Sequence, residues 1–186
     1  MNKMHERMFA IAPFGTRLGT RLEGKAAREQ LLATLVELPQ PGRLVILLED
    51  VEVLSGSFAD EAIAISYSRL AAGEYGDRYV VLRTPSPEIT DDLSHKLERR
   101  RLAVLCLTDD KWSVVGLLPT MMQETLALVI ERGETTARQL AEALNIRHNA
   151  CLHRVSRLAQ LRLIRRETVG FVGPHQSYRL FSILSP

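Results

Sequence analysis

The chain has 186 residues, of which 46% are hydrophobic and 25% charged, and its formal net charge is +2 at pH 7. This length suits one large domain or two small ones, and the apolar content is sufficient for a core. Apolar runs stay below the roughly 18 residues that span a bilayer, and Pro13 and Gly15 end the first apolar stretch too early for a secretory signal, so no membrane association is expected.

Strand and helix signals alternate over the first two thirds of the chain. The sequence predicts strands at 7–14, 43–51, 78–84, 102–108 and 112–118, and helices at 24–38, 55–73 and 86–101. This alternation indicates an α/β domain in which helices cover a sheet. Cys106 and Cys151 lie far apart in apolar contexts, which predicts no disulfide framework and favours a cytoplasmic location.

The pattern changes after Leu118. Helices are predicted at 120–133 and 135–145, a third begins near His148, and residues 165–184 read as a β-hairpin. The chain is therefore expected to form two domains, residues 1–118 (α/β) and residues 119–186 (α+β).

Charge is distributed unevenly between these two parts. Residues 1–118 hold 15 Lys and Arg against 17 Asp and Glu, whereas residues 119–186 hold 9 Arg, no Lys and 5 Glu. From Arg147 to the end there are 7 arginines and the single acid Glu167. The C-terminal part is thus the one suited to a polyanion.

Residues 137–158 have the pattern of a helix-turn-helix. The inner faces of the two helices are expected to be formed by Leu140, Ala141 and Leu144, and by Ala150, Cys151, Val155 and Leu158. The outward positions of the second helix are His148, Asn149, Leu152, His153 and Ser156, and most of these side chains can hydrogen-bond base edges in a major groove. Arg147, Arg154 and Arg157 flank them and can reach phosphates.

This segment resembles the winged-helix regulators of the ArsR and MarR type, through the helix, turn, helix order and the exit at Leu158, Leu161, Leu163, Ile164, Arg165 and Arg166. The resemblance implies a winged helix-turn-helix domain with a wing tip at Gly170–His175. It departs from the family at Arg162, where Gly is usual, and at Leu152, where Ser is frequent. The DNA contacts it implies are Arg147, His148, Asn149, His153, Arg154, Ser156, Arg157, Arg165, Arg166, His175 and Arg179.

Two other site signals are weak. The stretch Gly19–Ala26 nearly matches a phosphate-binding loop, but Ala26 replaces the hydroxyl that would hold Mg²⁺, so its glycines are expected to serve a turn between strand and helix. His148, His153 and His175 lack Cys or carboxylate partners at ligand spacing, and the metal-binding cysteines of the ArsR type have no counterpart, so no metal is predicted.

Most of residues 8–118 resemble the STAS-like domain of unknown function found in prokaryotes. Arg21 and Glu23 match its first motif, and Val51 and Phe58–Glu61 match its "FADE" motif; Glu49-Asp50 departs from it. The resemblance implies that Phe58 fills the core, and that Asp60 and Glu61 favour the helix dipole.

Ser55 and Ser57 lie where classical STAS domains carry a phosphorylated serine, although the acceptor position itself falls on Gly56. Helix capping and phosphorylation are both open for these serines. The candidates for regulation are Ser55, Ser57, Arg21 and Asp60, the last two also for a small-molecule ligand.

No nucleophile, base and orienting group converge in the sequence, so we expect neither an enzyme nor a cofactor. The function we expect is a homodimeric, DNA-binding transcriptional regulator of the cytoplasm, whose first domain senses a signal, dimerises or binds a partner. The alternative is a partner-switching interaction protein, similar to anti-sigma-factor antagonists, whose winged helix docks on protein.

Overall fold

A computed structural model describes residues 4–109, 111–172 and 175–185, with side chains outside 171–177. The chain is mixed α/β and divides into two compact units, residues 1–117 and 118–186. Within the described residues, no helix combines the length and the apolar character needed to cross a bilayer.

The first unit contains a five-stranded sheet. Its strands are β1 (His5–Ala10), β3 (Gly42–Leu47), β5 (Arg78–Arg83), β6 (Ala103–Thr108) and β7 (Lys111–Gly116), in the spatial order β1-β3-β5-β6-β7. The first four are parallel, and β7 runs antiparallel to β6. Two short strands, β2 (Arg17–Leu18) and β4 (Val53–Leu54), form a separate parallel pair that the sequence did not predict.

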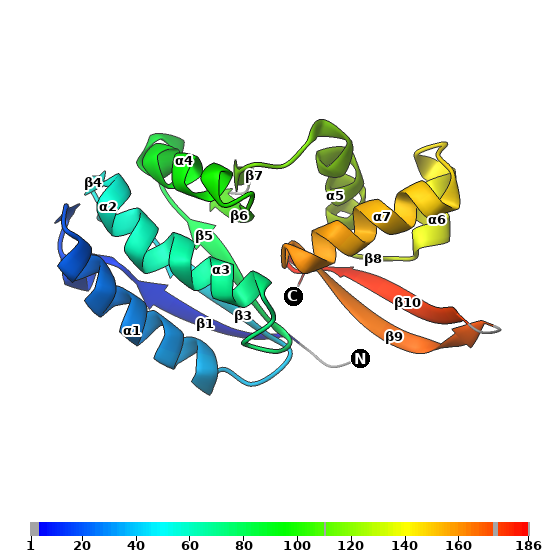
Figure 1. Ribbon diagram of the computed structural model, residues 1–186, viewed down its shortest axis with the longest axis horizontal. Helices are drawn as coiled ribbons and strands as arrows, with labels where there is room; N and C mark the ends of the chain where they lie inside the picture. Colours follow the sequence, from blue (N-terminus) through cyan, green and yellow to red (C-terminus); the bar gives the residue numbers. More distant parts are fainter. Residues whose placement is uncertain (1–3, 110, 173–174, 186) are drawn as a thin grey trace. The chain divides into compact units, whose positions relative to one another are not determined.

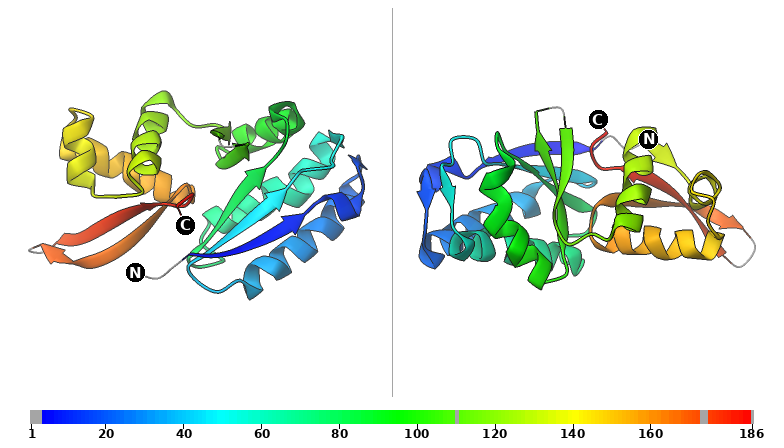
Figure 2. Two further views of the ribbon diagram at one scale, coloured as in Figure 1. Left: turned by 180° about the vertical axis from the view of Figure 1, so that it is seen from behind. Right: turned by 90° about the horizontal axis from the view of Figure 1, so that it is seen from above.

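Three helical segments lie on the same face of this sheet (Figures 1 and 2). They are α1 (Arg21–Glu37), α4 (Asp91–Arg99), and a long segment in which α2 (Gly56–Ala59) continues through a π-helical turn, η2 (Asp60–Ala64), into α3 (Ile65–Ala71). Single 3₁₀ turns occur at η1 (Ala12–Phe14) and η3 (Pro87–Thr90).

Helix α1 begins three residues earlier than predicted because Thr20 caps it. The Thr20 hydroxyl accepts a hydrogen bond from the Glu23 amide at 3.2 Å, and the Glu23 carboxylate accepts one from the Thr20 amide at 2.9 Å. This capping box satisfies two amides that the helix leaves unpaired. The hydrogen bond from the Thr20 side chain is the main reason why the pKa of Glu23 lies below its ordinary value.

Gly24 lies inside α1, which corrects the prediction that it serves a turn. A Cβ atom there would lie 2.9 Å from Cβ of Glu61 and 3.0 Å from the backbone oxygen of Phe58. Glycine therefore allows the backbones of α1 and α2 to approach closely, over the fully buried Phe58 ring.

Arg78, the first residue of β5, caps the other end of α1. Its guanidinium donates to the backbone oxygens of Val36, Leu38 and Tyr75 at 2.8, 2.7 and 3.0 Å. The last carbonyls of a helix have no partner within it, so a fork of donors from a neighbouring strand replaces water there. This contact joins the end of α1 to the sheet.

The second unit consists of three helices and a three-stranded antiparallel sheet. The order along the chain is α5 (Thr120–Arg132), β8 (Glu134–Thr135), α6 (Ala137–Ala143), α7 (His148–Gln160), β9 (Ile164–Val172) and β10 (His175–Ser182). The strands lie in the order β8-β10-β9. The two-residue strand β8 was not predicted, and β9 and β10 extend further toward the hairpin turn than predicted.

The core of the second unit follows the apolar periodicity of its helices. Leu126 and Val129 of α5, Leu140 of α6, and Val155 and Leu158 of α7 are all at most 3% exposed. Helix α6 begins with a second capping box, formed by Thr136 and Gln139. Its end, at Asn145, has a φ of 51°, a left-handed conformation that asparagine tolerates better than most residues.

Candidate functional site

The outward face of α7 carries the predicted base-contacting side chains. Asn149, His153 and Ser156 are exposed, as are Leu152 and Gln160, and these five positions follow helical spacing. Cys151, Val155 and Leu158 on the opposite face are buried, whereas Ala150, which was predicted to lie on that inner face, is exposed. The structure thus brings the predicted polar residues onto one solvent-facing stripe of a 13-residue helix.

The surface of α7 contains no carboxylate, because no Asp or Glu occurs between Arg147 and Arg166. An exposed helix usually mixes both signs, since opposite charges three or four residues apart stabilise it. Here the arginines bond to neutral oxygens instead. This leaves their positive charge uncompensated by any acid on the same helix.

The N-terminus of α7 is exposed and receives no side-chain cap from its N-cap residue, Arg147. Arg147 and His148 are both exposed, and they line a surface hollow together with Arg138, Glu142 and Asn145. Helices α1, α2 and α6, by contrast, begin with a capping side chain. An uncapped helix N-terminus flanked by cations is suited to a phosphate group, although Glu142 at the rim opposes it.

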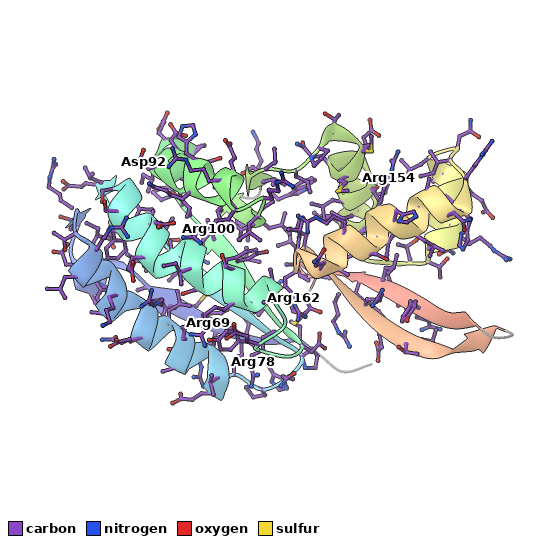
Figure 3. The ribbon with its side chains drawn as sticks, viewed as in Figure 1. Arg69, Arg78, Asp92, Arg100, Arg154 and Arg162 are labelled. Atoms are coloured by element: carbon purple, nitrogen blue, oxygen red, sulfur yellow. The ribbon has the colours of Figure 1, made fainter. Side chains whose placement is uncertain are left out.

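Arg154 lies beside this outward face, on the side of α7 that packs against α5. Its guanidinium donates to the backbone oxygen of Met121 at 3.0 Å and to the hydroxyl of the fully buried Thr125 at 3.3 Å. Figure 3 labels Arg154 on the side of α7 that faces α5. Arg154 therefore fixes the orientation of α7 against α5 and is a positioning residue.

Arg157 lies at the edge of the outward face. Its guanidinium donates to the side-chain oxygen of Gln160, one turn later, at 2.8 Å. This contact leaves the positive charge in place, because the glutamine amide is neutral. Arg157 therefore keeps its predicted suitability for phosphate.

The arginines of the β9–β10 hairpin differ from one another. Arg166 is exposed and its guanidinium lies 4.4 Å from the ring centre of Tyr178, a cation–π arrangement. Arg179 is exposed and pairs with Glu134 at 3.0 Å. His175 begins β10, and its side chain lies outside the described residues.

Arg165 is buried, with 8% of its surface exposed, and this corrects the prediction that it contacts phosphate. Its guanidinium pairs with the Glu167 carboxylate at 3.2 Å and lies 5.0 Å from the ring centre of Phe181. A guanidinium held in this way contributes to the packing of the hairpin.

The turn after α7 keeps a left-handed residue although glycine is absent. Arg162 has a φ of 59°, its amide donates to the backbone oxygen of Ala159, and the Leu163 amide donates to that of Leu158. These two bonds form the usual helix-ending motif, in which glycine is favoured at the left-handed position. Arg162 thus stands where the winged-helix families usually have glycine, but the backbone conformation of the turn is the one that glycine favours.

In the first unit, Asp60 and Glu61 bind arginines from two different helices. Glu61 accepts from Arg28 of α1 at 2.5 Å and lies 3.7 Å from Arg21, while Asp60 accepts from Arg100, next to α4, at 2.9 Å. Arg21 and Asp60 therefore have separate charged partners.

Ser55 and Ser57 lie at the start of α2. The Ser55 oxygen accepts from the Phe58 amide at 3.3 Å, and its hydroxyl donates to the Gly19 backbone oxygen at 2.9 Å, so Ser55 is the helix cap. Ser57 is half-buried. The adjacent Gly56 amide donates to the Asp92 carboxylate at 2.9 Å, so a negative charge from α4 already occupies this end of α2.

Several of these contacts could not be found by sequence reasoning. Arg28, Arg78 and Arg100 lie on helices and strands whose patterns indicate only ordinary exposed cations, and their partners are 33 to 42 residues away. Among the described residues, no group of three His, Cys, Asp or Glu side chains is placed to hold a metal ion.

No protein-family model matches the sequence, and no curated protein matches it.

Proposed function

We propose that the protein is a DNA-binding transcriptional regulator. In this proposal, residues 118–186 are a winged helix-turn-helix of the ArsR and MarR kind, and α7 is the helix that enters a major groove. Residues 1–117 are a STAS-like domain that senses a signal, dimerises or binds a partner. The order of helix, helix, helix and β-hairpin in α5, α6, α7 and β9–β10 supports this proposal.

The observation that carries the proposal is the outward face of α7. It presents Asn149, His153 and Ser156, whose side chains can donate to or accept from base edges, on a helix without a carboxylate. Exposed Arg147 and Arg166 lie at the start of that helix and on the hairpin, where phosphate contacts are expected. An ordinary solvent-exposed helix carries both acidic and basic side chains, so a helix with basic and neutral side chains but no acid favours an anionic partner.

The proposed regulator acts as a two-fold dimer in the cytoplasm. Winged-helix and related helix-turn-helix proteins bind half-sites whose centres lie about 10 base pairs apart, or a multiple of this spacing, because successive turns of the groove must face the dimer. We place the dimer contact in the first unit or in α5.

The second candidate is an interaction protein whose second unit docks on another protein. The exposed Leu152, on the same face of α7, favours it, since an apolar side chain in a polar stripe is also typical of protein interfaces. This candidate predicts weak DNA binding that disappears by moderate salt and shows no sequence preference.

The first test is selection of bound sequences from a random duplex pool by the full-length protein at about physiological salt. The proposal expects an enriched inverted repeat. Retention only at low salt, without enrichment, would favour the second candidate.

Substitutions then distinguish the residues that contact bases from those that contact phosphates. Asn149→Ala or His153→Ala should cost roughly 1–3 kcal/mol on the enriched site and little on random DNA, whereas Arg166→Gln should weaken all DNA and lower the salt slope by about 1. Arg69→Gln is the matched control, because Arg69 is an exposed cation of the first unit that pairs with Glu74 at 2.7 Å. Equal losses from Arg69→Gln and Arg166→Gln would contradict the assignment.

A further inference from the structure

The outward face of α7 has an unusual chemical composition for a helix proposed to enter DNA. Beyond His148 and Ala150 in its first turn, its exposed side chains are two carboxamides, an imidazole, a hydroxyl and an isobutyl group, at Asn149, Gln160, His153, Ser156 and Leu152. None of these five is Arg or Lys.

The absence of Arg and Lys from these five positions bears on which bases can be read. The commonest specific contact to guanine is a bidentate bond from Arg or Lys to O6 and N7. This stretch of helix contains two arginines. Arg154 donates to the Met121 backbone and to Thr125 and so faces α5, and Arg157, at the edge of the face, donates to the Gln160 side chain. The five outward positions of α7 therefore lack the side chains that make the commonest guanine contact.

Two side chains on the first turns of α7 match an A·T pair instead. The Asn149 carboxamide can bond N6 and N7 of adenine in a bidentate manner, and an apolar side chain such as Leu152 contacts the thymine methyl group. Leu152 is 38% exposed, so this contact would bury apolar surface that the free protein leaves in water. His153 can donate to N7 of either purine and does not distinguish them.

The spacing of Asn149 and Leu152 suits neighbouring base pairs. Three residues advance an α-helix by roughly 4.5 Å, which is on the order of the ~3.4 Å rise of one base pair. Both residues are also on the exposed stripe rather than on opposite sides of the helix.

We propose that α7 reads A·T pairs, with Asn149 bound to an adenine and Leu152 against the methyl group of a thymine one or two base pairs away. This inference rests on the proposed DNA-binding function. It assigns Leu152 a specificity role that an exposed leucine does not have on an ordinary surface helix.

The experiment measures binding of the full-length protein to duplexes of the enriched site in which single bases are replaced. Thymine→uracil removes only the methyl group, and 7-deazaadenine removes only the N7 acceptor. At one thymine per half-site, uracil should weaken binding about three- to fivefold, as expected for the burial of one methyl group. Leu152→Ser, which keeps an exposed residue at that position, should abolish this difference.

The same design applies to Asn149. Replacing one adenine by 7-deazaadenine should weaken binding of the wild-type protein at least fivefold and leave Asn149→Ala unaffected. Comparing each base change in each variant isolates the contact, because a variant that merely weakens binding still responds to the modified base.

The outcomes separate this inference from the function. Enriched sites with G·C pairs at the positions protected by Asn149 and Leu152 would overturn the A·T assignment and leave the DNA-binding function intact. A uracil effect that persists in Leu152→Ser would overturn the methyl contact. Absence of any enriched site would defeat the proposed function, and this inference with it.

Discussion

Several arginines of the first unit and the arginines of α7 in the second unit bond to different kinds of partner. In the first, arginines pair with carboxylates from other elements: Arg28 of α1 with Glu61, Arg100 with Asp60, and Arg83 of β5 with Glu49 at 2.6 Å. On α7 of the second unit, Arg154 and Arg157 bond to neutral oxygens of Met121, Thr125 and Gln160.

The kind of partner decides whether the positive charge of an arginine can act on a molecule outside the protein. An arginine paired with a carboxylate contributes little to the field outside the protein, because the two charges cancel over a short distance. An arginine bonded to a carbonyl or a carboxamide is held in position and keeps its full charge. The surface of α7 therefore carries positive charge that no acid on the same helix cancels.

The largest expected effect comes from breaking the pairing in the first unit. Glu61→Gln should lower the free energy of unfolding of that unit by about 2–3 kcal/mol, since the side chains of Glu61 and Arg28 are only 15% and 20% exposed and a cation would lose its partner. Urea unfolding followed by the fluorescence of Trp112, the single tryptophan, measures it.

Glu37→Gln is the control for this measurement. Glu37 pairs with Arg7 at 3.1 Å, but its side chain is 71% exposed, so the loss should stay below about 0.5 kcal/mol. Equal losses in the two variants would show that burial does not decide the value of these pairs.

The two units also differ in the environment of their cysteines, since each unit contains one. Burial raises the pKa of Cys106 in β6 to about 11, whereas for Cys151 in α7 the rise caused by burial is opposed by the nearby charge of Arg154. The unfolded thiol ionises near pH 9 and the folded Cys106 thiol does not, so its contribution to stability is complete below that pH and is lost as pH approaches 11.

This loss is measurable by urea unfolding. Between about pH 8 and pH 10.5, the wild-type first unit should lose roughly 2 kcal/mol more than Cys106→Val. A parallel decline of the two proteins would contradict the contribution of Cys106.

A substitution at Arg154 tests whether an arginine that bonds only to neutral oxygens also stabilises its unit. Arg154→Met keeps the apolar stem and removes the bonds to Met121 and Thr125, and it should destabilise the second unit by about 1–2 kcal/mol. Hydrogen exchange of α7 amides measures this change. An unchanged exchange rate, with a lower salt slope for DNA, would return Arg154 to the phosphate contacts.

The smallest effects are expected at the helix ends. Arg101 after α4 and Arg162 after α7 have φ values of 55° and 59°, so Arg101→Gly and Arg162→Gly should each stabilise their own unit by roughly 0.5–1 kcal/mol. Asn145→Gly, at a φ of 51°, should gain less, because asparagine tolerates this conformation. Thermal unfolding of the three variants ranks them, and a larger gain at Asn145 would contradict the argument.

Periodicity made the longer elements predictable. The apolar run before Glu49 identifies a strand, and the helical spacing of apolar residues around Leu140 and at Val155 and Leu158 identifies two helices, because burial imposes a fixed spacing on the sequence. The exposed stripe of α7 follows from the same periodicity, so Asn149 and His153 could be placed on it from the sequence.

Pairing between distant residues was not predictable. Nothing local distinguishes Arg154, which bonds to Met121 33 residues earlier, from Arg157, which bonds to Gln160 on its own helix. The burial of Arg165 depends on Phe181 across the hairpin, and the place of Gly24 depends on Glu61 of another helix. The role of each residue depends on which side of its helix or strand packs against another element, and the local sequence pattern does not contain that information.

Arg78 has a consequence for the order of folding. Its guanidinium reaches the backbone oxygens of Val36 and Leu38, about 40 residues earlier in the chain, so the loop formed by β3 and the α2–α3 segment must close before the contact exists. The first turns of α1 are secured locally by Thr20 and Glu23, whereas its last turn waits for β5. Helix α1 should therefore form from its N-terminus, with its C-terminal turn completed late, in the step that joins β5 to β3.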